Sequence, residues 1–209
     1  MIGVYALVLG TPQGVVGARG EPLRAVVCGE FSALTGEAPP QLSVEALRAH
    51  EAAVRRIAEA SEACLPARFG AASNDDASLL GDLTPRAAEL SEALQLVRGR
   101  EQMTLRVHGP ALPAPAPASS GTRYLEERRR AWKFPELDPL RDALAELIRA
   151  ERVERHSEPG LLASVYHLID RGAAARYQQL AGEVRLEGLR IAVSGPWPAW
   201  SFAPEVAAP

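Results

Sequence analysis

The apolar positions in the first half of the chain change their period several times. Residues 2–9 are apolar throughout, as expected of a strand that is buried on both faces. Residues 23–28 predict a second strand, and residues 103–107 alternate apolar and polar positions like a half-buried strand. Residues 63–69 contain Pro66, which favours an edge strand or an extended turn.

Two stretches of this half have helical spacing. The first follows Ser43, a suitable N-cap, and its stripe consists of Val44, Leu47, His50, Val54 and Ile57. The second begins at Thr84-Pro85, and its stripe consists of Leu83, Ala87, Leu90, Leu94 and Val97. Strands and helices mix here without regular alternation, which predicts an α+β domain with one mostly antiparallel sheet and helices on one face.

The second half repeats this plan. Residues 124–132 predict a charged helix, 161–169 a strand, 173–184 a short helix and 189–193 a last strand. A further helix begins at Asp138-Pro139, with an apolar face of Leu140, Leu144, Leu147 and Ile148.

Residues 109–121 separate the two halves. This segment alternates proline with small residues, which removes backbone donors and predicts a semi-rigid linker or a long surface loop. We therefore expect an N-terminal domain over 1–108 and a C-terminal domain over 122–209, each large enough for a small core.

Composition narrows the possible functions. The chain has 209 residues, of which 23 are basic and 26 acidic, so its formal charge of −3 argues against binding nucleic acid. The run 2–9 is too short to cross a bilayer, and Cys28 and Cys64 lie far apart in apolar stretches. We expect a cytoplasmic protein with two buried thiols, no disulfide and no membrane contact.

Candidate chemistry is sparse. His50-Glu51 begins like a H-E-x-x-H zinc motif, but Val54 stands where the second histidine belongs. His50 is then either a buried histidine with a satisfied hydrogen bond or part of a polar network or interface. His108, His156 and His167 fall on separate elements, so we expect no metal site, no cofactor and no catalytic centre.

Two segments stand out from this background. Arg68 lies in an apolar stretch, and if buried it needs a carboxylate or carbonyl partner. Trp197, Trp200 and Phe202 fall within six positions of a proline-rich tail, which either covers its own domain or contacts a partner. We expect Trp197 to anchor the tail on the second domain, and Trp200 and Phe202 to share one side of an extended chain as an apolar contact.

Four stretches resemble the signature segments of the gas vesicle accessory protein F/L family, in the family's order and over nearly the whole chain. They are Ala49-His50-Glu51, residues 64–70 with Arg68-Phe69-Gly70, residues 121–125, and residues 194–202. The ending Gly-Pro-Trp-Pro followed by an aromatic residue, Ser and Phe is the most specific. The chain departs from the usual pattern at residues 71–73, which are small, and at Trp200, where tyrosine is more usual.

The resemblance implies a protein that is not an enzyme and takes part in gas vesicle assembly. It implies two α+β domains of ferredoxin-like arrangement that bind the hydrophobic shell protein, and other accessory proteins as well, and support nucleation or growth of the shell. His50, Glu51, Arg68 and Phe69 become structural or interaction candidates, with Glu51 a partner for Arg68. The alternatives are a small-ligand protein or enzyme on a ferredoxin-like fold and, less favoured by the negative charge, an RNA-binding module.

Overall fold

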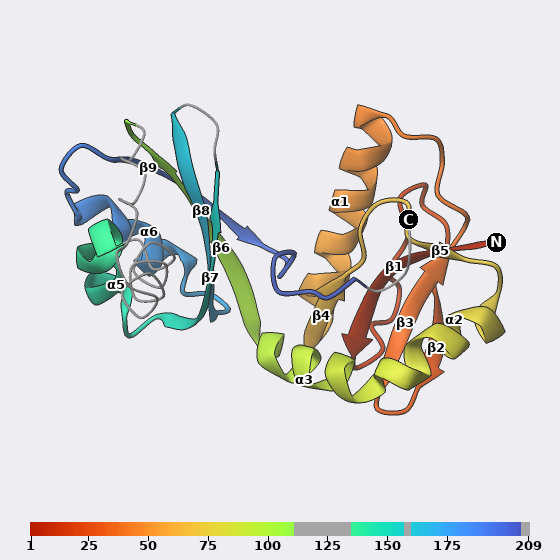
Figure 1. Cartoon of the computed structure of the whole chain (residues 1–209). Coiled ribbons are helices and arrows are strands. Elements are labelled where there is room, and N and C mark those ends of the chain that lie inside the picture. The colour runs from red at the N-terminus through yellow and green to blue at the C-terminus, as the bar shows by residue number, and fades with distance from the viewer. Residues whose placement is uncertain (111–134, 157–159, 206–209) are drawn as a thin grey trace, which may run out of the picture. The chain divides into compact units, whose positions relative to one another are not determined.

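The chain folds into two compact units, each built around its own β-sheet (Figure 1). The computed structural model describes residues 1–110, 135–156 and 160–205. The first unit comprises Met1–Glu101 and Trp197–Pro209, and the second comprises Gln102–Pro196. In sequence, the second unit is thus an insertion between the body of the first unit and its C-terminal segment.

This division differs from the predicted one at 109–121. Strand β6 (Arg100–His108) crosses the boundary and belongs to the second sheet, so its apolar alternation serves the second core. The tail from Trp197 onward belongs to the first unit. Residues 111–121 lie outside the described part of the chain. A proline-rich composition does not distinguish a loop within one unit from a linker between two, and the sequence pattern of a strand does not say which sheet it joins.

The first sheet has the order β2-β3-β1-β4, with β5 beside β1, and its strand pairs are antiparallel. The strands are β1 (Ile2–Leu9), β2 (Arg24–Cys28), β3 (Phe31–Gly36), β4 (Ala63–Pro66) and β5 (Ala72–Ser73). β1 lies in the middle and is buried along most of its length, as its unbroken apolar run predicts. β3 was not predicted; it returns from β2 through Gly29-Glu30, where Gly29 has a φ of 61°.

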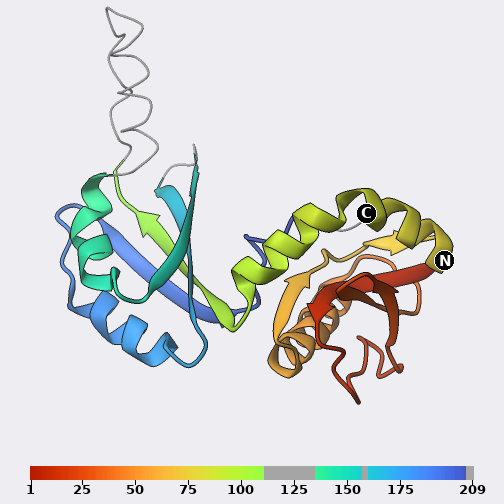
Figure 2. The same ribbon diagram turned by 90° about the horizontal axis from the view of Figure 1, so that it is seen from below.

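Helices cover both faces of this sheet, where one covered face was expected (Figure 2). α1 (Val44–Ala60) lies on one face; α2 (Asp76–Leu83), the 3₁₀ turn η1 (Thr84–Arg86) and α3 (Ala87–Val97) lie on the other. α1 begins as predicted, because Ser43 Oγ accepts a hydrogen bond from the Ala46 N–H at 3.1 Å. Two covered faces follow from the apolar character of β1 and β3, since both faces of these central strands must be kept from water.

The second unit has the strand order β7-β8-β6-β9. After β6, its described elements are η2 (Pro135–Leu137), α5 (Asp138–Leu144), β7 (Ile148–Arg155), β8 (Leu161–Asp170), α6 (Ala174–Glu183) and β9 (Arg190–Trp197). The βαββαβ succession in this order is the ferredoxin-like arrangement, and α5 and α6 lie on one face of the sheet (Figure 1). The α+β class expected from the sequence is confirmed.

One predicted helix of this unit is shorter than expected. α5 ends at Leu144, and Ile148, expected on its apolar face, instead begins β7. An apolar residue at the end of a helix and one at the start of a strand look alike in sequence. The helix predicted over 124–132 lies outside the described residues. None of the described helices combines the length and the apolar character needed to cross a membrane.

Candidate functional site

The first unit contains a group of four ring side chains, Tyr5, His50, Phe69 and Trp200, which we call the aromatic cluster. His50 lies at its centre. The Tyr5 ring stacks on His50 at 5.2 Å between centroids, and Phe69 meets it edge-on at 5.7 Å. Trp200, from the C-terminal tail, lies 6.4 Å away at a tilt of 44°. β1, α1, the loop after β4 and the tail each contribute one ring.

A single hydrogen bond orients the His50 ring. Its Nε2 lies 3.0 Å from the carbonyl oxygen of Ala67, and because that oxygen only accepts, Nε2 carries the hydrogen. Burial lowers the pKa of His50. The hydrogen bond to Ala67 raises it, but by less than burial lowers it. His50 is therefore a neutral, buried histidine, one of the two alternatives that the sequence left open.

Tyr5 ties the loop between β1 and β2 to the cluster. Its hydroxyl donates to Glu21 Oε1 at 2.6 Å and accepts from the Ala18 N–H at 2.9 Å. Burial, followed by the bond to Glu21, raises the pKa of Tyr5 to about 12, so the phenol stays protonated. Gly17 allows this approach, since a Cβ there would lie 1.9 Å from Glu21 Oε1.

The tail folds as a tight turn onto the first unit. Trp200 N–H donates to the Pro198 carbonyl at 2.7 Å, and Phe202 N–H donates to the Ala199 carbonyl at 3.0 Å. Phe202 is only 2% exposed, and Trp200 packs against the core formed by α1 and β1. The expectation of an extended tail that displays both rings is corrected, because the turn directs Phe202 into the core.

Trp197 also contacts the first unit, where we expected the second. The guanidinium of Arg55, on α1, lies 4.9 Å from the centre of the Trp197 ring, a cation–π arrangement. Glu51 pairs with Arg55 at 3.0 Å, one helical turn away. Glu51 thus positions the guanidinium over Trp197 and is not the partner expected for Arg68.

Arg68 is exposed and does not lie in the core. β4 ends at Pro66, so Arg68 has already left the sheet, and its side chain is 78% exposed. Its ion pair is with Glu205 of the tail at 3.4 Å, and Arg86 also holds that residue, through its carbonyl oxygen, at 2.5 Å. Exposed pairs of this kind contribute about 0–1 kcal/mol each, so Arg68 helps to hold the end of the tail without stabilising a buried charge.

A small hollow opens beside the cluster. It is lined by Tyr5, His50 and Phe69 together with Pro39 and Pro40, and has a volume of about 20 Å³. This volume is sufficient for about one water molecule and far below that of a metabolite site. The cluster is suited to packing.

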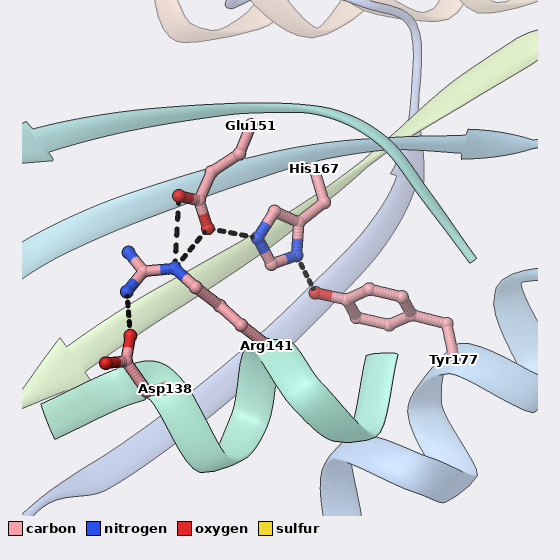
Figure 3. A network of polar contacts seen from close by, with 5 residues as sticks. All are labelled: Asp138, Arg141, Glu151, His167 and Tyr177. Atoms are coloured by element: carbon pink, nitrogen blue, oxygen red, sulfur yellow. Dashed lines mark hydrogen bonds and ion pairs between the residues drawn. The ribbon is translucent and has the colours of Figure 1, made fainter. Parts of the chain in front are cut away.

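The second unit contains a polar network of Asp138, Arg141, Glu151, His167 and Tyr177 (Figure 3). Arg141 Nε donates to both Glu151 oxygens at 3.2 and 3.0 Å, and its Nη1 donates to Asp138 at 2.9 Å. His167 Nε2 lies 2.9 Å from Glu151 Oε2, and its Nδ1 lies 2.7 Å from the Tyr177 hydroxyl. The network joins α5, β7, β8 and α6.

The charges of this network favour an ionised Glu151. Burial alone would raise the pKa of Glu151, but the hydrogen bonds and charges of His167 and Arg141 lower it to about 2. The carboxylate only accepts, so His167 Nε2 carries a hydrogen, while Nδ1 faces the Tyr177 hydroxyl. Burial and the charge of Glu151 raise the pKa of Tyr177.

The order carboxylate, imidazole and hydroxyl is that of an acid–base relay, but such a relay must reach a substrate. His167 is 1% exposed and Tyr177 is 0% exposed. The network is suited to cross-linking four elements around the core of the second unit. Within residues 1–110, 135–156 and 160–205, no group of three or more potential ligands is placed to hold a metal ion.

Sequence reasoning missed Tyr5, Glu21 and the polar network. Tyr5 stands within an apolar strand and has no local signal that links it to Glu21. Glu151 and His167 are directly opposite each other in the β7–β8 pair, and this register becomes visible only once the strands are paired.

Comparisons with known proteins agree over nearly the whole chain. The model of a family described as "Gas vesicle synthesis protein GvpL/GvpF" matches residues 2–204. Gas vesicle protein L from Streptomyces sp. (strain CB03234) is 27% identical over 236 residues, covering 92% of this chain and 87% of the relative.

Two solved structures share the fold. The crystal structure of the gas vesicle protein GvpF from Anabaena sp. PCC7120 superimposes with a TM-score of 0.72 at 17% identity, covering 97% of this chain and 95% of that one. GvpF from Microcystis aeruginosa gives a TM-score of 0.72 at 16% identity, covering 97% and 98%. The two-unit architecture is therefore common to these three chains.

Proposed function

Because this chain belongs to the GvpL/GvpF family of gas vesicle synthesis proteins, we propose that it is an assembly factor that binds the hydrophobic shell protein and supports nucleation or growth of the shell. It acts in the cytoplasm in association with the vesicle, alongside other accessory proteins. The observation that carries this proposal is the family match from residue 2 to residue 204, which includes both units and the tail.

The physical task explains why such a factor is needed. A wall that keeps liquid water out of a gas space must present apolar surface on its inner side. Before assembly, that surface is exposed to water and tends to aggregate. A water-soluble protein that covers part of it with apolar and aromatic side chains holds the subunit in a state that can still assemble.

The first unit offers side chains for this contact. Phe69 and Trp200 are both half-buried, with one side in the aromatic cluster and the other toward solvent. Aromatic residues that are fixed by packing contribute large contact area at low entropic cost, and they are enriched at protein interfaces. We therefore place part of the shell-protein contact at Phe69 and Trp200, with the buried Phe202 anchoring the tail that carries Trp200.

We further propose that the protein is not an enzyme. The ordered acid–base groups of the polar network support this, because both His167 and Tyr177 are buried and already bonded to protein partners. A catalytic role for these residues would require the core of the second unit to open. Their arrangement supports a structural role.

Co-purification tests the proposal. The tagged chain is expressed together with the shell protein of the same organism, with the tag alone as control. We expect the chain to keep the shell protein in the soluble fraction and to co-purify with it. If the shell protein sediments equally in both samples and none is captured, the chain acts at another step of vesicle synthesis.

A further inference from the structure

The N-terminal end of α1 carries an unusual density of exposed apolar side chains. Of the six large hydrophobic residues that are most exposed in the described part of the chain, three lie within six positions. Leu42 is 73% exposed, Val44 65% and Leu47 42%. Single exposed apolar residues need no explanation, but a contiguous group marks an interaction surface.

These residues continue the stripe that forms the core. Leu47 stands one turn before His50 and shares its helical face, and from His50 onward the stripe is buried through Val54 and Ile57. In Figure 1 the N-terminal turns of α1 extend beyond the strands that the rest of the helix covers. The sequence pattern is thus that of a packed helix over its full length, whereas the fold covers only the later turns.

The surface is continuous with the aromatic cluster. Pro39 and Pro40, which precede α1, line the same hollow as His50 and Phe69. We use the name α1 ridge for the three exposed residues Leu42, Val44 and Leu47 together with the half-buried Pro39 and Pro40.

The size and charge of the α1 ridge indicate what covers it. Five side chains of this size offer only a few hundred Å², whereas each partner in a stable dimer contributes about 800 Å². A second copy of this chain is therefore a poor fit as the sole occupant. The exposed charges beside the ridge, Glu45 and Arg48, have opposite sign, so recognition depends on apolar contact.

A line of apolar side chains along a helix is complementary to another helix, because the ridges of one fit the grooves of the other. A short amphipathic helix would meet it through residues spaced three and four apart. Resting on the function proposed above, we propose that the α1 ridge is where one amphipathic helix of the shell protein docks, next to Phe69 and Trp200.

A matched pair of double variants tests this assignment. Val44→Glu/Leu47→Glu places two charges on the ridge. Val27→Glu/Leu96→Glu places the same two charges elsewhere on the first unit, at a valine that is also 65% exposed and a leucine that is 36% exposed. All four side chains are exposed, so we expect both proteins to melt within about 2 °C of the wild type.

The readouts are capture of co-expressed shell protein and sedimentation velocity of the isolated chain. We expect the ridge variant to capture at least about tenfold less shell protein than the control variant, which behaves like the wild type. Equal capture by the two folded variants overturns the assignment. A wild-type dimer that the ridge variant abolishes also overturns it, because the ridge is then covered by a second copy.

The same experiment distinguishes an error in the proposed function from an error in the docking site. If the wild-type chain captures no shell protein at all, the proposed function is overturned and this assignment falls with it. If the wild type and both variants capture shell protein equally, only the α1 ridge is excluded and the proposed function stands.

Discussion

Protonating His50 places a positive charge among Tyr5, Phe69 and Trp200 without adding a partner for it. Because burial lowers the pKa of His50 in the folded state, its neutral form stabilises the first unit. That contribution is complete above the unfolded pKa of about 6.5 and is lost as the pH falls through the folded value. Mild acid should therefore loosen the junction between α1, the loop after β4 and the tail.

We expect the melting temperature of the first unit to fall by at least about 2 °C between pH 7.5 and pH 5.5. His50→Gln, which keeps a donor for the Ala67 carbonyl but does not titrate, should show a smaller fall. His108→Gln, in the second unit, is the control and should follow the wild type. Equal pH dependence in all three proteins would show that His50 titrates without loss of packing.

The carboxylate of Glu151 makes a second pH-dependent contribution to stability, this time in the second unit. Its pKa is lowered from 4.5 to about 2 in the folded protein. The stabilisation is complete above the unfolded value and lost as the pH falls toward 2. At neutral pH it is fully present, and replacing the carboxylate by an amide removes the charge and leaves one acceptor oxygen where Arg141 and His167 now use two.

We expect Glu151→Gln to lower the free energy of unfolding of the second unit by about 1.5–3 kcal/mol, the range for hydrogen bonds to charged groups. Glu154→Gln is the matched control: it lies on the same strand, accepts one bond from Tyr166 at 2.9 Å and is exposed. It should cost less than about 1 kcal/mol. Urea denaturation at pH 7 measures both, and equal losses would contradict the structural role of the network.

At the scale of elements, the C-terminal tail completes the first unit. Phe202 is buried, Pro198 and Ala199 are buried beside it, and Glu205 is held by Arg68 and Arg86. The tail follows β9 of the second sheet, so the last strand of one unit leads directly into a core segment of the other.

Phe202→Ala should destabilise the first unit by about 3–5 kcal/mol, the cost of truncating a buried aromatic side chain. Trp197→Ala should cost clearly less, because that ring is half-buried and its cation–π contact contributes about 0.5–1 kcal/mol when exposed. Chemical denaturation followed by far-UV circular dichroism measures both losses. A Phe202→Ala protein of near wild-type stability would place Phe202 on the surface in solution.

At the scale of the whole molecule, the chain passes from the first unit to the second through β6 and returns through β9. β6 is an internal strand of the second sheet, between β8 and β9. A break in the chain after β6 would therefore leave each unit with pieces from both sides of the break.

A specific protease site introduced within residues 111–121 tests this connectivity. After cleavage we expect the two pieces to elute together as one folded particle, because β6 stays paired in the second sheet and the tail stays in the first core. Denaturant should be needed to separate them. Two pieces that separate without denaturant would restore the division at 109–121 that the sequence predicted.

The sequence by itself determined the elements with a strong local signal. The apolar run of β1, the alternation of β6, the N-cap at Ser43 and the stripe of α3 each predicted an element that the structure contains. These signals are local, because backbone hydrogen bonding and side-chain direction within one element depend on residues a few positions apart. The mixture of strand and helix patterns also predicted the α+β class, and the family segments added the ferredoxin-like arrangement.

The tertiary structure decided which elements meet. The pattern of β6 is the same whichever sheet it joins, and the tail of Trp197, Trp200 and Phe202 suits a cover for either unit or for a partner. Arg68 lies in an apolar stretch of sequence and yet outside the core, because β4 ends two residues earlier. Glu151 and His167 meet only through the register of β7 on β8. Such contacts join residues far apart in sequence, and their energy depends on chain topology, which no local pattern contains.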